Sequence, residues 1–244
     1  MALILVTGAS AGLGLLTATT LADEGHEVVL HVRNPGRAPD RAVLDRMRAV
    51  VHGDLSDREE TLRVARQADR TGSFDAVIHN AGVLRGSGPE VFAVNILAPF
   101  ILTAAMAPPG RSIFLTSSLH LSGSTDLGAL DSTGRGDAYA DSKLHVTALA
   151  MALAVRRPDV LAHAVDPGWV PTRMGGPGAS DDLDEGHRTQ EWLATADASG
   201  IDPRSGGYWY HRTARRPHPA ALDPRFQEEL LHALTARTGL TLEP

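Results

Sequence analysis

Tyr139 and Lys143 stand four residues apart in a stretch with helical spacing. Side chains at this spacing project from one face of a helix, about one turn apart. A free tyrosine, with a pKa of about 10, is a poor base at neutral pH, but a nearby ammonium stabilises the phenolate and lowers that pKa. The pair therefore predicts a general acid/base, in which Tyr139 exchanges a proton and Lys143 tunes it.

Lys143 is also the single lysine among 23 basic side chains. Only three positions of the 244 follow a tyrosine by four residues, so a lysine placed at random would rarely occupy one of them. A compact ammonium can also donate to a cofactor ribose, a role for which the planar guanidinium is poorly shaped. The position of this single lysine therefore indicates a role in the acid/base site rather than a chance placement.

A glycine-rich loop, TGASAGLG at 7–14, lies between the first expected strand and the first expected helix. Backbone N–H groups and the helix dipole attract a phosphate at such a position. The spacing G-x-x-x-G-x-G departs from the common G-x-G-x-x-G fingerprint, but the strand–turn–helix context is that of a dinucleotide site. A glycine turn without any ligand is the alternative interpretation.

The second expected strand ends at Val32-Arg33-Asn34. An acidic residue at this point pairs with the ribose hydroxyls of NAD, whereas an arginine accommodates a 2′-phosphate. Because Arg33 can grip a phosphate with two hydrogen bonds and no acid stands at the tip, the sequence favours NADP(H) over NAD(H). The alternative is that Arg33 is one of many solvated arginines.

Short, almost continuously apolar runs alternate with helical segments along the chain, which predicts parallel strands buried by helices on both faces. We expect one α/β domain over 1–244, with a Rossmann-type doubly wound parallel sheet. Strands are expected at 3–7, 28–32, 50–51, 74–78, 113–116, 161–165 and, as the last, 208–210. Helices are expected at 13–22, 91–106, 138–155 and 224–235. A further charged helix is expected to begin at a Ser56 cap and to run through residue 70.

The composition changes after the sixth expected strand. Residues 169–207 are rich in Gly, Pro, Asp and Ser around one amphipathic stretch near 191–196. We interpret 169–207 as a substrate lid rather than a second core. The terminal helix that follows presents four apolar side chains on one face, namely Phe226, Leu230, Leu231 and Leu234.

Charge and cysteine content exclude several classes of function. The net charge of −6 argues against a nucleic-acid surface. The absence of cysteine excludes disulfides, thiolate nucleophiles and cysteine-bound zinc, and fits a cytoplasmic protein. The N-terminal apolar run is too short for a signal peptide or a membrane span. The eleven histidines, His145, His163 and His211 among them, show no ligand spacing, so no metal is expected.

These motifs, in this order, resemble the short-chain dehydrogenases/reductases from about Leu3 to the C-terminus. Besides the glycine loop and Y-x-x-x-K, the resemblance rests on an Asp-Leu pair, H-N-A-G in place of the family's N-N-A-G, an asparagine inside a helix, a strand-end serine and a proline–glycine motif. Stretch 205–209 and the proline-rich sequel are similar to the retinol-dehydrogenase-like and carbonyl-reductase-like branch.

The resemblance implies roles for these residues. Ser118 would bind the substrate oxygen, Tyr139 would exchange its proton, Lys143 would bind the nicotinamide ribose, and Asn95, in a helix kink, would support the proton relay. Ser117 is the competitor of Ser118; adjacent strand residues face opposite sides, and the family pattern selects the second. His79 receives no role. The cofactor-binding residues would be Gly8, Ser10, Gly12, Leu13, Gly14, Arg33, Asn34, Asp54, Leu55, Asn80, Ala81, Gly82, Tyr139, Lys143, Pro167, Gly168, Val170 and Thr172.

The expected function is that of an NADP(H)-dependent ketoreductase or alcohol dehydrogenase acting on a small to medium, largely apolar molecule. Two alternatives stay open: a dehydratase, epimerase or cyclase on the same core, and a catalytically silent NADP(H)-binding protein. The segments on either side of Asn95 are shorter than in the family, and the long segment from Ser118 to Tyr139 should form a flap over the substrate. Since related proteins pair through these helices, a homodimer or homotetramer is expected.

Overall fold

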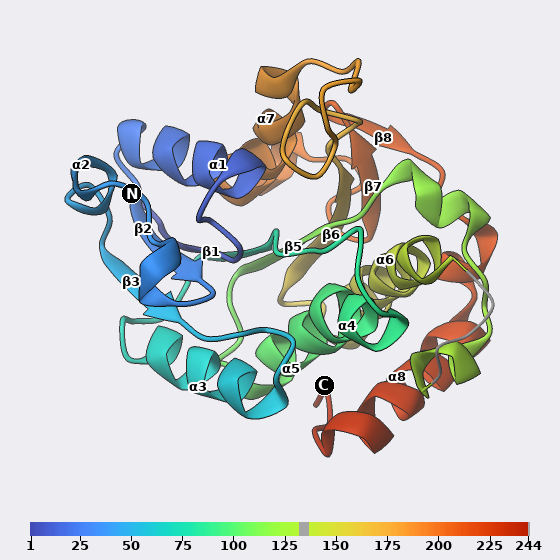
Figure 1. The fold of residues 1–244 in the computed structure, drawn as a ribbon. Coiled ribbons are helices and arrows are strands. Elements are labelled where there is room, and N and C mark those ends of the chain that lie inside the picture. Colours follow the sequence, from blue (N-terminus) through green and yellow to red (C-terminus); the bar gives the residue numbers. More distant parts are fainter. Residues whose placement is uncertain (132–136, 244) are drawn as a thin grey trace.

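The computed structural model describes residues 1–131 and 137–243, and in this part of the chain one eight-stranded sheet forms the centre (Figure 1). The strand order is β3-β2-β1-β4-β5-β6-β7-β8, and all pairs are parallel except β7 with β8. The order reverses between β1 and β4, which confirms the doubly wound α/β fold.

The strands are β1 Leu3–Val6, β2 Glu27–Val32, β3 Ala49–His52, β4 Ala76–His79, β5 Arg111–Leu115, β6 Leu161–Asp166, β7 Gly207–Tyr210 and β8 Thr213–Arg215. The α-helices are α1 Gly12–Asp23, α2 Arg41–Leu44, α3 Arg58–Asp69, α4 Gly88–Phe92, α5 Ala98–Ala105, α6 Ala138–Arg156, α7 Leu183–Thr195 and α8 Pro224–Thr238. The sheet therefore has one strand beyond 208–210, because β7 turns back into β8.

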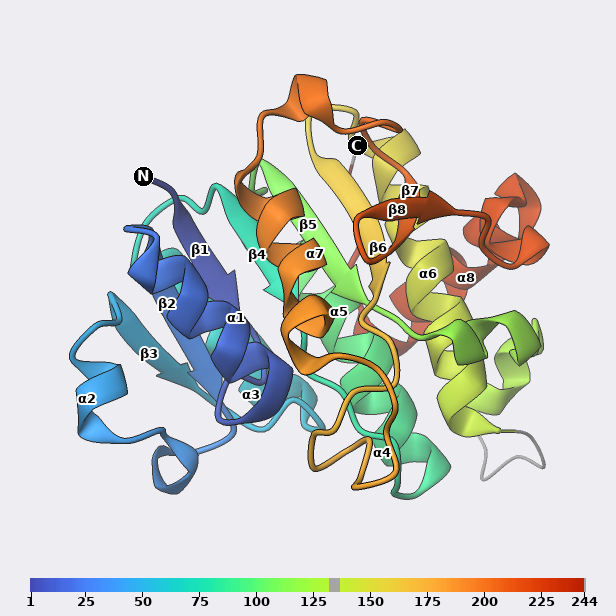
Figure 2. The same ribbon diagram turned by 90° about the horizontal axis from the view of Figure 1, so that it is seen from above.

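Helices cover both faces of the sheet (Figure 2). On one face, apolar side chains of α1 and α7 pack on alternate strand residues such as Ile4 and Val6. On the other face, α3 and α5 pack against Leu5 and Val77. Burial from both sides explains why the strands lack the apolar–polar alternation of a half-exposed sheet.

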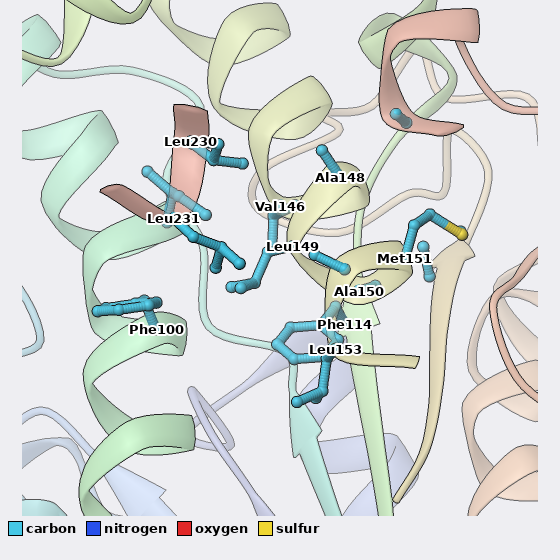
Figure 3. Packing of buried hydrophobic residues seen from close by; sticks show 14 of the residues in the cluster. Phe100, Phe114, Val146, Ala148, Leu149, Ala150, Met151, Leu153, Leu230 and Leu231 are labelled. Carbon is cyan, nitrogen blue, oxygen red and sulfur yellow. The ribbon is translucent and has the colours of Figure 1, made fainter. Parts of the chain in front are cut away.

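Helix α6 lies inside the protein rather than on its surface. Every residue from Ala140 to Leu153 is buried. Its apolar side chains pack on Phe114 of β5 and Phe100 of α5, and α8 covers it from outside through Leu230 and Leu231 (Figure 3). The helix that carries Tyr139 and Lys143 in its first turns is therefore held firmly by its neighbours.

The segment 169–207, interpreted above as one lid, divides into two parts. From Leu183 onward α7 belongs to the fold, since it packs on β4, β5 and β6 and its Leu193 is fully buried. Arg111 of β5 donates to the carbonyls of Leu193 and Ala196 at 2.7 and 2.6 Å. Residues 196–206, with a 3₁₀ turn at Ala198–Gly200, connect α7 to β7. A lid function is therefore proposed only for the loop 169–182.

Two local expectations differ from the structure. Asp57, not Ser56, caps α3, and its carboxylate accepts the N–H of Glu60. The expected flap before Tyr139 falls partly on 132–136, which lie outside the described residues; the part that is described contains 3₁₀ turns at Ser118–Ser122 and Leu127–Asp131.

The helical run Gly88–Ala105 is long and apolar enough by composition to cross a membrane. It packs instead in the core, where α5 contacts Val64 and Phe74 on one side and α6 on the other. It is therefore explained as a core helix.

Candidate active site

The expected site residues come together at the carboxyl ends of the parallel strands. The glycine loop follows β1, Asn80–Gly82 follows β4, Ser117 follows β5, and Pro167-Gly168 follows β6. In open α/β sheets this edge, at the reversal of strand order, is where ligands bind. Topology thus assembles the motifs from five separate parts of the chain, including the first turn of α6.

Asn95 lies in a π-helical turn, Ala93–Leu97, between α4 and α5. Such turns widen a helix and are frequent at functional sites. The buried Asn95 amide accepts the N–H of Val83 at 2.8 Å and donates to the carbonyl of Val83 and to the hydroxyl of Ser142. Asn95 therefore ties the loop after β4 to the first turn of α6.

Lys143 is buried and points toward the end of β5. Its Nζ donates to the carbonyl of Leu115 at 2.8 Å. A side-chain carbon at Gly82 would lie 3.5 Å from this Nζ, so the backbone after β4 passes close to it. Burial lowers the pKa of Lys143 to about 8, and the charge of Asp166 opposes that change.

Tyr139 occupies the first turn of α6, whose N-terminus is capped by Asp137. Burial raises the pKa of Tyr139 to about 12, a hydrogen bond with the Ser117 side chain lowers it, and the charges of Asp166 and Asp137 raise it further. The sequence predicted that Lys143 would lower this pKa toward neutrality, and in the structure this is wrong. The Lys143 ammonium lies over the phenol ring, 5.4 Å from its centroid.

The structure brings Ser117, rather than Ser118, to the Tyr139 hydroxyl. Alternating strand faces would distinguish the two serines only if both continued the strand. In fact β5 ends at Leu115, Ser117 is extended, and Ser118 opens the 3₁₀ turn with its side chain exposed. Because period-two alternation ends with the strand, it cannot select Ser118.

The glycine loop is held tightly from two sides. Gly8 and Gly12 have φ values of +66° and +59°, a conformation that favours glycine. The Asn80 amide donates to the carbonyls of Thr7 and Gly8, and a side-chain carbon at Gly14 would meet that amide at 2.3 Å.

His31 is a loop support that the sequence analysis missed. Its Nδ1 accepts the N–H of Gly8 at 3.1 Å, so its Nε2 carries the proton and donates to the carbonyl of Gly53 at 3.0 Å. Burial lowers the pKa of His31, which keeps the ring neutral. The only signal in the sequence was a polar residue inside an apolar strand.

The start of α1 fits the phosphates of a dinucleotide. Helices α3, α6, α7 and α8 each have an aspartate that caps the N-terminus, whereas no described side chain caps α1. The first turn of α1 also contains no acidic residue. Its free N–H groups, next to Ser10 and Leu13, can therefore receive an anion.

At the end of β2, Arg33 and Asn34 are exposed. Arg33 lies 3.8 Å from the carboxylate of Asp54, and about half of its side-chain surface is accessible. Burial raises the pKa of Asp54, but hydrogen bonds from Ser56 and the charge of Arg33 outweigh this and lower it. The adjacent Leu55 is buried, so the polar Arg33 and Asp54 side chains lie next to an apolar surface.

The proline–glycine motif lies between two carboxylates. Asp166 is buried, accepts the Gly168 N–H at 2.9 Å and receives the Tyr208 hydroxyl at 3.1 Å. Asp181 accepts the Trp169 N–H at 2.7 Å and the Tyr210 hydroxyl at 3.5 Å. Two tyrosines of β7 thus brace the turn from one side.

After this turn the chain folds back over the glycine loop. Val170 is buried. The Thr172 side chain lies 3.5 Å from the position of a side-chain carbon at Gly12. The structure therefore places Thr172, which follows Pro167, Gly168 and Val170 in the chain, beside the glycine loop.

The described part of the chain contains no group of three His, Asp or Glu side chains that could hold a metal ion. His79 is buried and stacks on Phe114, with ring centroids 4.5 Å apart. Burial lowers its pKa to about 3. His79 therefore packs in the core.

Comparison with protein families and known proteins gives a consistent result. A family model described as short chain dehydrogenase matches residues 2–182. The short-chain dehydrogenase chyC of Penicillium rubens is 36% identical over 259 aligned residues, which cover 99% of each protein.

Two solved structures share the fold. A Mycobacterium paratuberculosis protein superposes with a TM-score of 0.84 at 23% identity and covers 100% of this chain and 96% of its own. An NADPH-bound carbonyl reductase from chicken fatty liver superposes with a TM-score of 0.68 at 22% identity. The superposition covers 85% of this chain and 95% of the reductase.

Proposed function

The chain belongs to the short-chain dehydrogenase family, and from this premise we propose that it is an NADP(H)-dependent oxidoreductase that interconverts a carbonyl group and an alcohol. The observation that supports this best is the convergence of Ser117, Tyr139 and Lys143 at the sheet edge beside the glycine loop. Two hydroxyl groups there can meet one substrate oxygen.

The proton chemistry follows from the ionisation of these groups. With a pKa near 12, Tyr139 keeps its proton at neutral pH and can donate it to an oxygen that gains negative charge. The Ser117 hydroxyl can donate a hydrogen bond to the same oxygen, which stabilises that charge. A bound nicotinamide would supply or accept the hydride. One proton and one hydride together convert a carbonyl into an alcohol.

Lys143 and Asn95 would support this step. Lys143, with a pKa of about 8, is mostly charged at pH 7 and would donate to the cofactor ribose. Asn95 would support the proton relay, and its side-chain amide holds the loop at Val83 to Ser142 of α6.

The preference for NADP(H) rests on Arg33, whose exposed guanidinium stands at the end of β2 beside Asp54. A guanidinium at this point suits a 2′-phosphate. The carbonyl reductase from chicken fatty liver, which shares the fold, was solved with NADPH bound.

The test is turnover of a panel of neutral aldehydes and ketones with NADPH or NADH, with the products identified by mass. We expect the alcohol product, faster with NADPH, and loss of turnover in Tyr139→Phe with NADPH affinity nearly unchanged. A product formed without net NADPH oxidation would instead indicate a dehydratase, epimerase or cyclase. NADPH binding with no turnover of any panel member would favour a silent cofactor-binding protein.

A further inference from the structure

His120 is a fully buried histidine, three residues after Ser117, with no role in the chemistry described above. Its ring contacts the nearby Ser117 and two residues far along the chain, Tyr208 and His218. Nδ1 lies 2.7 Å from the carbonyl oxygen of Ser117, and Nε2 lies 3.1 Å from the backbone nitrogen of His218. The ring also meets Tyr208 edge-on, with centroids 4.7 Å apart.

These contacts determine which ring nitrogen is protonated. The backbone N–H of His218 can only donate, so Nε2 of His120 accepts, and the proton of the neutral ring resides on Nδ1. Nδ1–H therefore donates to the Ser117 carbonyl. The same carbonyl accepts the His120 backbone N–H at 3.0 Å. Two hydrogen bonds thus hold the peptide that bears the Ser117 side chain.

The outer partners of His120 are themselves held in place. His218 accepts the Ala220 N–H through Nδ1 and so caps the 3₁₀ turn Pro219–Leu222 that precedes α8. Tyr208 donates to Asp166, directly before the Pro167-Gly168 turn. The imidazole therefore joins the end of β5 to the C-terminal segment and to the strand that braces the end of β6.

We propose that His120 is a positioning residue, which holds the Ser117 hydroxyl in register with the Tyr139 hydroxyl through the Ser117 backbone carbonyl. The Ser117 backbone leaves β5 and has no strand ladder of its own. Its hydroxyl accepts the Leu119 N–H at 3.3 Å, and the His120 ring adds a second constraint, on the Ser117 carbonyl. A mutation far from the reacting atoms can lower the rate roughly 100-fold when it displaces a reacting group by about 1 Å. This inference rests on the proposed function.

Two amide variants separate the hydrogen bond from simple packing. In His120→Asn the amide nitrogen can reach the place of Nδ1 and donate to Ser117. In His120→Gln the longer side chain reaches toward His218 and leaves the Ser117 carbonyl without its side-chain donor. Both substitutions remove the ring, so they lose the Tyr208 contact equally. We expect kcat to be largely retained in His120→Asn and to fall about 10-fold or more in His120→Gln, with NADPH affinity unchanged in both.

A readout without turnover is ¹³C NMR of protein labelled at tyrosine Cζ, which gives three signals because the chain has three tyrosines. We expect the Tyr139 signal to move in His120→Gln and to stay near its wild-type position in His120→Asn, while the Tyr208 signal moves in both. An unmoved Tyr139 signal in His120→Gln, or equal shifts and equal kcat losses in the two variants, would overturn the proposal.

The two measurements also separate this inference from the proposed function. If the wild-type protein reduces no carbonyl compound, the proposed function fails, and the NMR comparison still decides whether His120 positions the Ser117 turn. If the wild-type protein is active and both variants keep full kcat, the role of His120 fails alone.

Discussion

The Lys143 ammonium lies over the face of the Tyr139 ring, 5.4 Å from its centroid. Its hydrogen bond goes to the carbonyl of Leu115, so the two side chains meet as a cation and a π face. In the proposed function, Lys143 would anchor the cofactor ribose beside the acid Tyr139.

This geometry predicts that Lys143→Arg loses activity although the charge is kept. The Nζ lies between Leu115 and the backbone of Gly82, where a side-chain carbon on Gly82 would already be at 3.5 Å. A planar guanidinium is wider than an ammonium and does not fit this gap. We expect kcat to fall at least about 100-fold, in the range of a lost acid/base function. Full activity in steady-state assays would mean that the lone lysine is an accident of composition.

Much of the site could be predicted because its signals are local. The apolar runs identify the buried strands, the glycine spacing marks the phosphate loop, and Tyr139 and Lys143 follow from one helical turn. The choice between Ser117 and Ser118 could not be made this way. It depends on whether the strand ends at Leu115 or continues by two residues, and strand ends are poorly determined by local sequence.

Other features depend on contacts between distant segments. His120 meets His218 at a separation of 98 residues, and no local pattern marks such a pair. The Gly, Pro, Asp and Ser content of 169–207 suggested one lid, but α7 within it packs on the sheet. Its His187 and Glu191 are both buried, and Nδ1 of His187 lies 2.6 Å from a carboxylate oxygen of Glu191. This hydrogen bond lets a polar sequence pack on the sheet.

A matched pair of serine variants tests which hydroxyl acts. Ser117→Ala should lower kcat by roughly 100-fold, as expected when one donor to a developing oxyanion is lost. Ser118→Ala removes an exposed hydroxyl one residue further along and should leave kcat near the wild-type value. Steady-state kinetics with one carbonyl substrate compare the two. The reverse order of effects would restore Ser118 as the substrate-binding serine.

Arg33→Gln tests the cofactor preference. Loss of a charged hydrogen bond worth about 1.5–3 kcal/mol should weaken NADPH binding by roughly 10- to 100-fold and leave NADH binding almost unchanged. Arg66→Gln removes the same charge from an exposed position at the end of α3 and serves as the control. Fluorescence titration with both cofactors gives the dissociation constants. Equal weakening for NADH and NADPH would reject the 2′-phosphate role.

The burial of α6 leads to a prediction that differs from the homodimer or homotetramer expected from the sequence: we expect the protein to be a monomer. Helix α8 covers α6 through Leu230 and Leu231, so the surface that a partner helix would need is already filled by the chain itself (Figure 3). Light scattering after size exclusion should give a mass near 25.8 kDa at micromolar concentration. A stable mass of twice or four times this value would show that another face mediates assembly.

Lys143 also predicts how stability depends on pH. Its pKa is about 8 in the folded protein, against the ordinary lysine value of 10.5 that applies to the unfolded chain. Between these values the unfolded chain binds more protons, so stability rises with pH. A difference of this size should add about 1.5 kcal/mol to the free energy of unfolding between about pH 8 and about pH 9.5. Below about pH 8 the Lys143 ammonium is charged in both the folded and the unfolded state, so the cost of burying its charge lowers the stability of the folded protein in full.

Lys143→Met isolates this effect, because it removes the titrating group and keeps an unbranched apolar side chain at the site. Urea unfolding of both proteins at each pH gives the difference between them, and shared contributions from groups such as Tyr139 largely cancel. We expect the wild-type protein to gain stability relative to Lys143→Met as pH rises through this window. A constant difference, or one that changes in the opposite direction, would show that the Lys143 ammonium is not destabilised by burial in the folded protein.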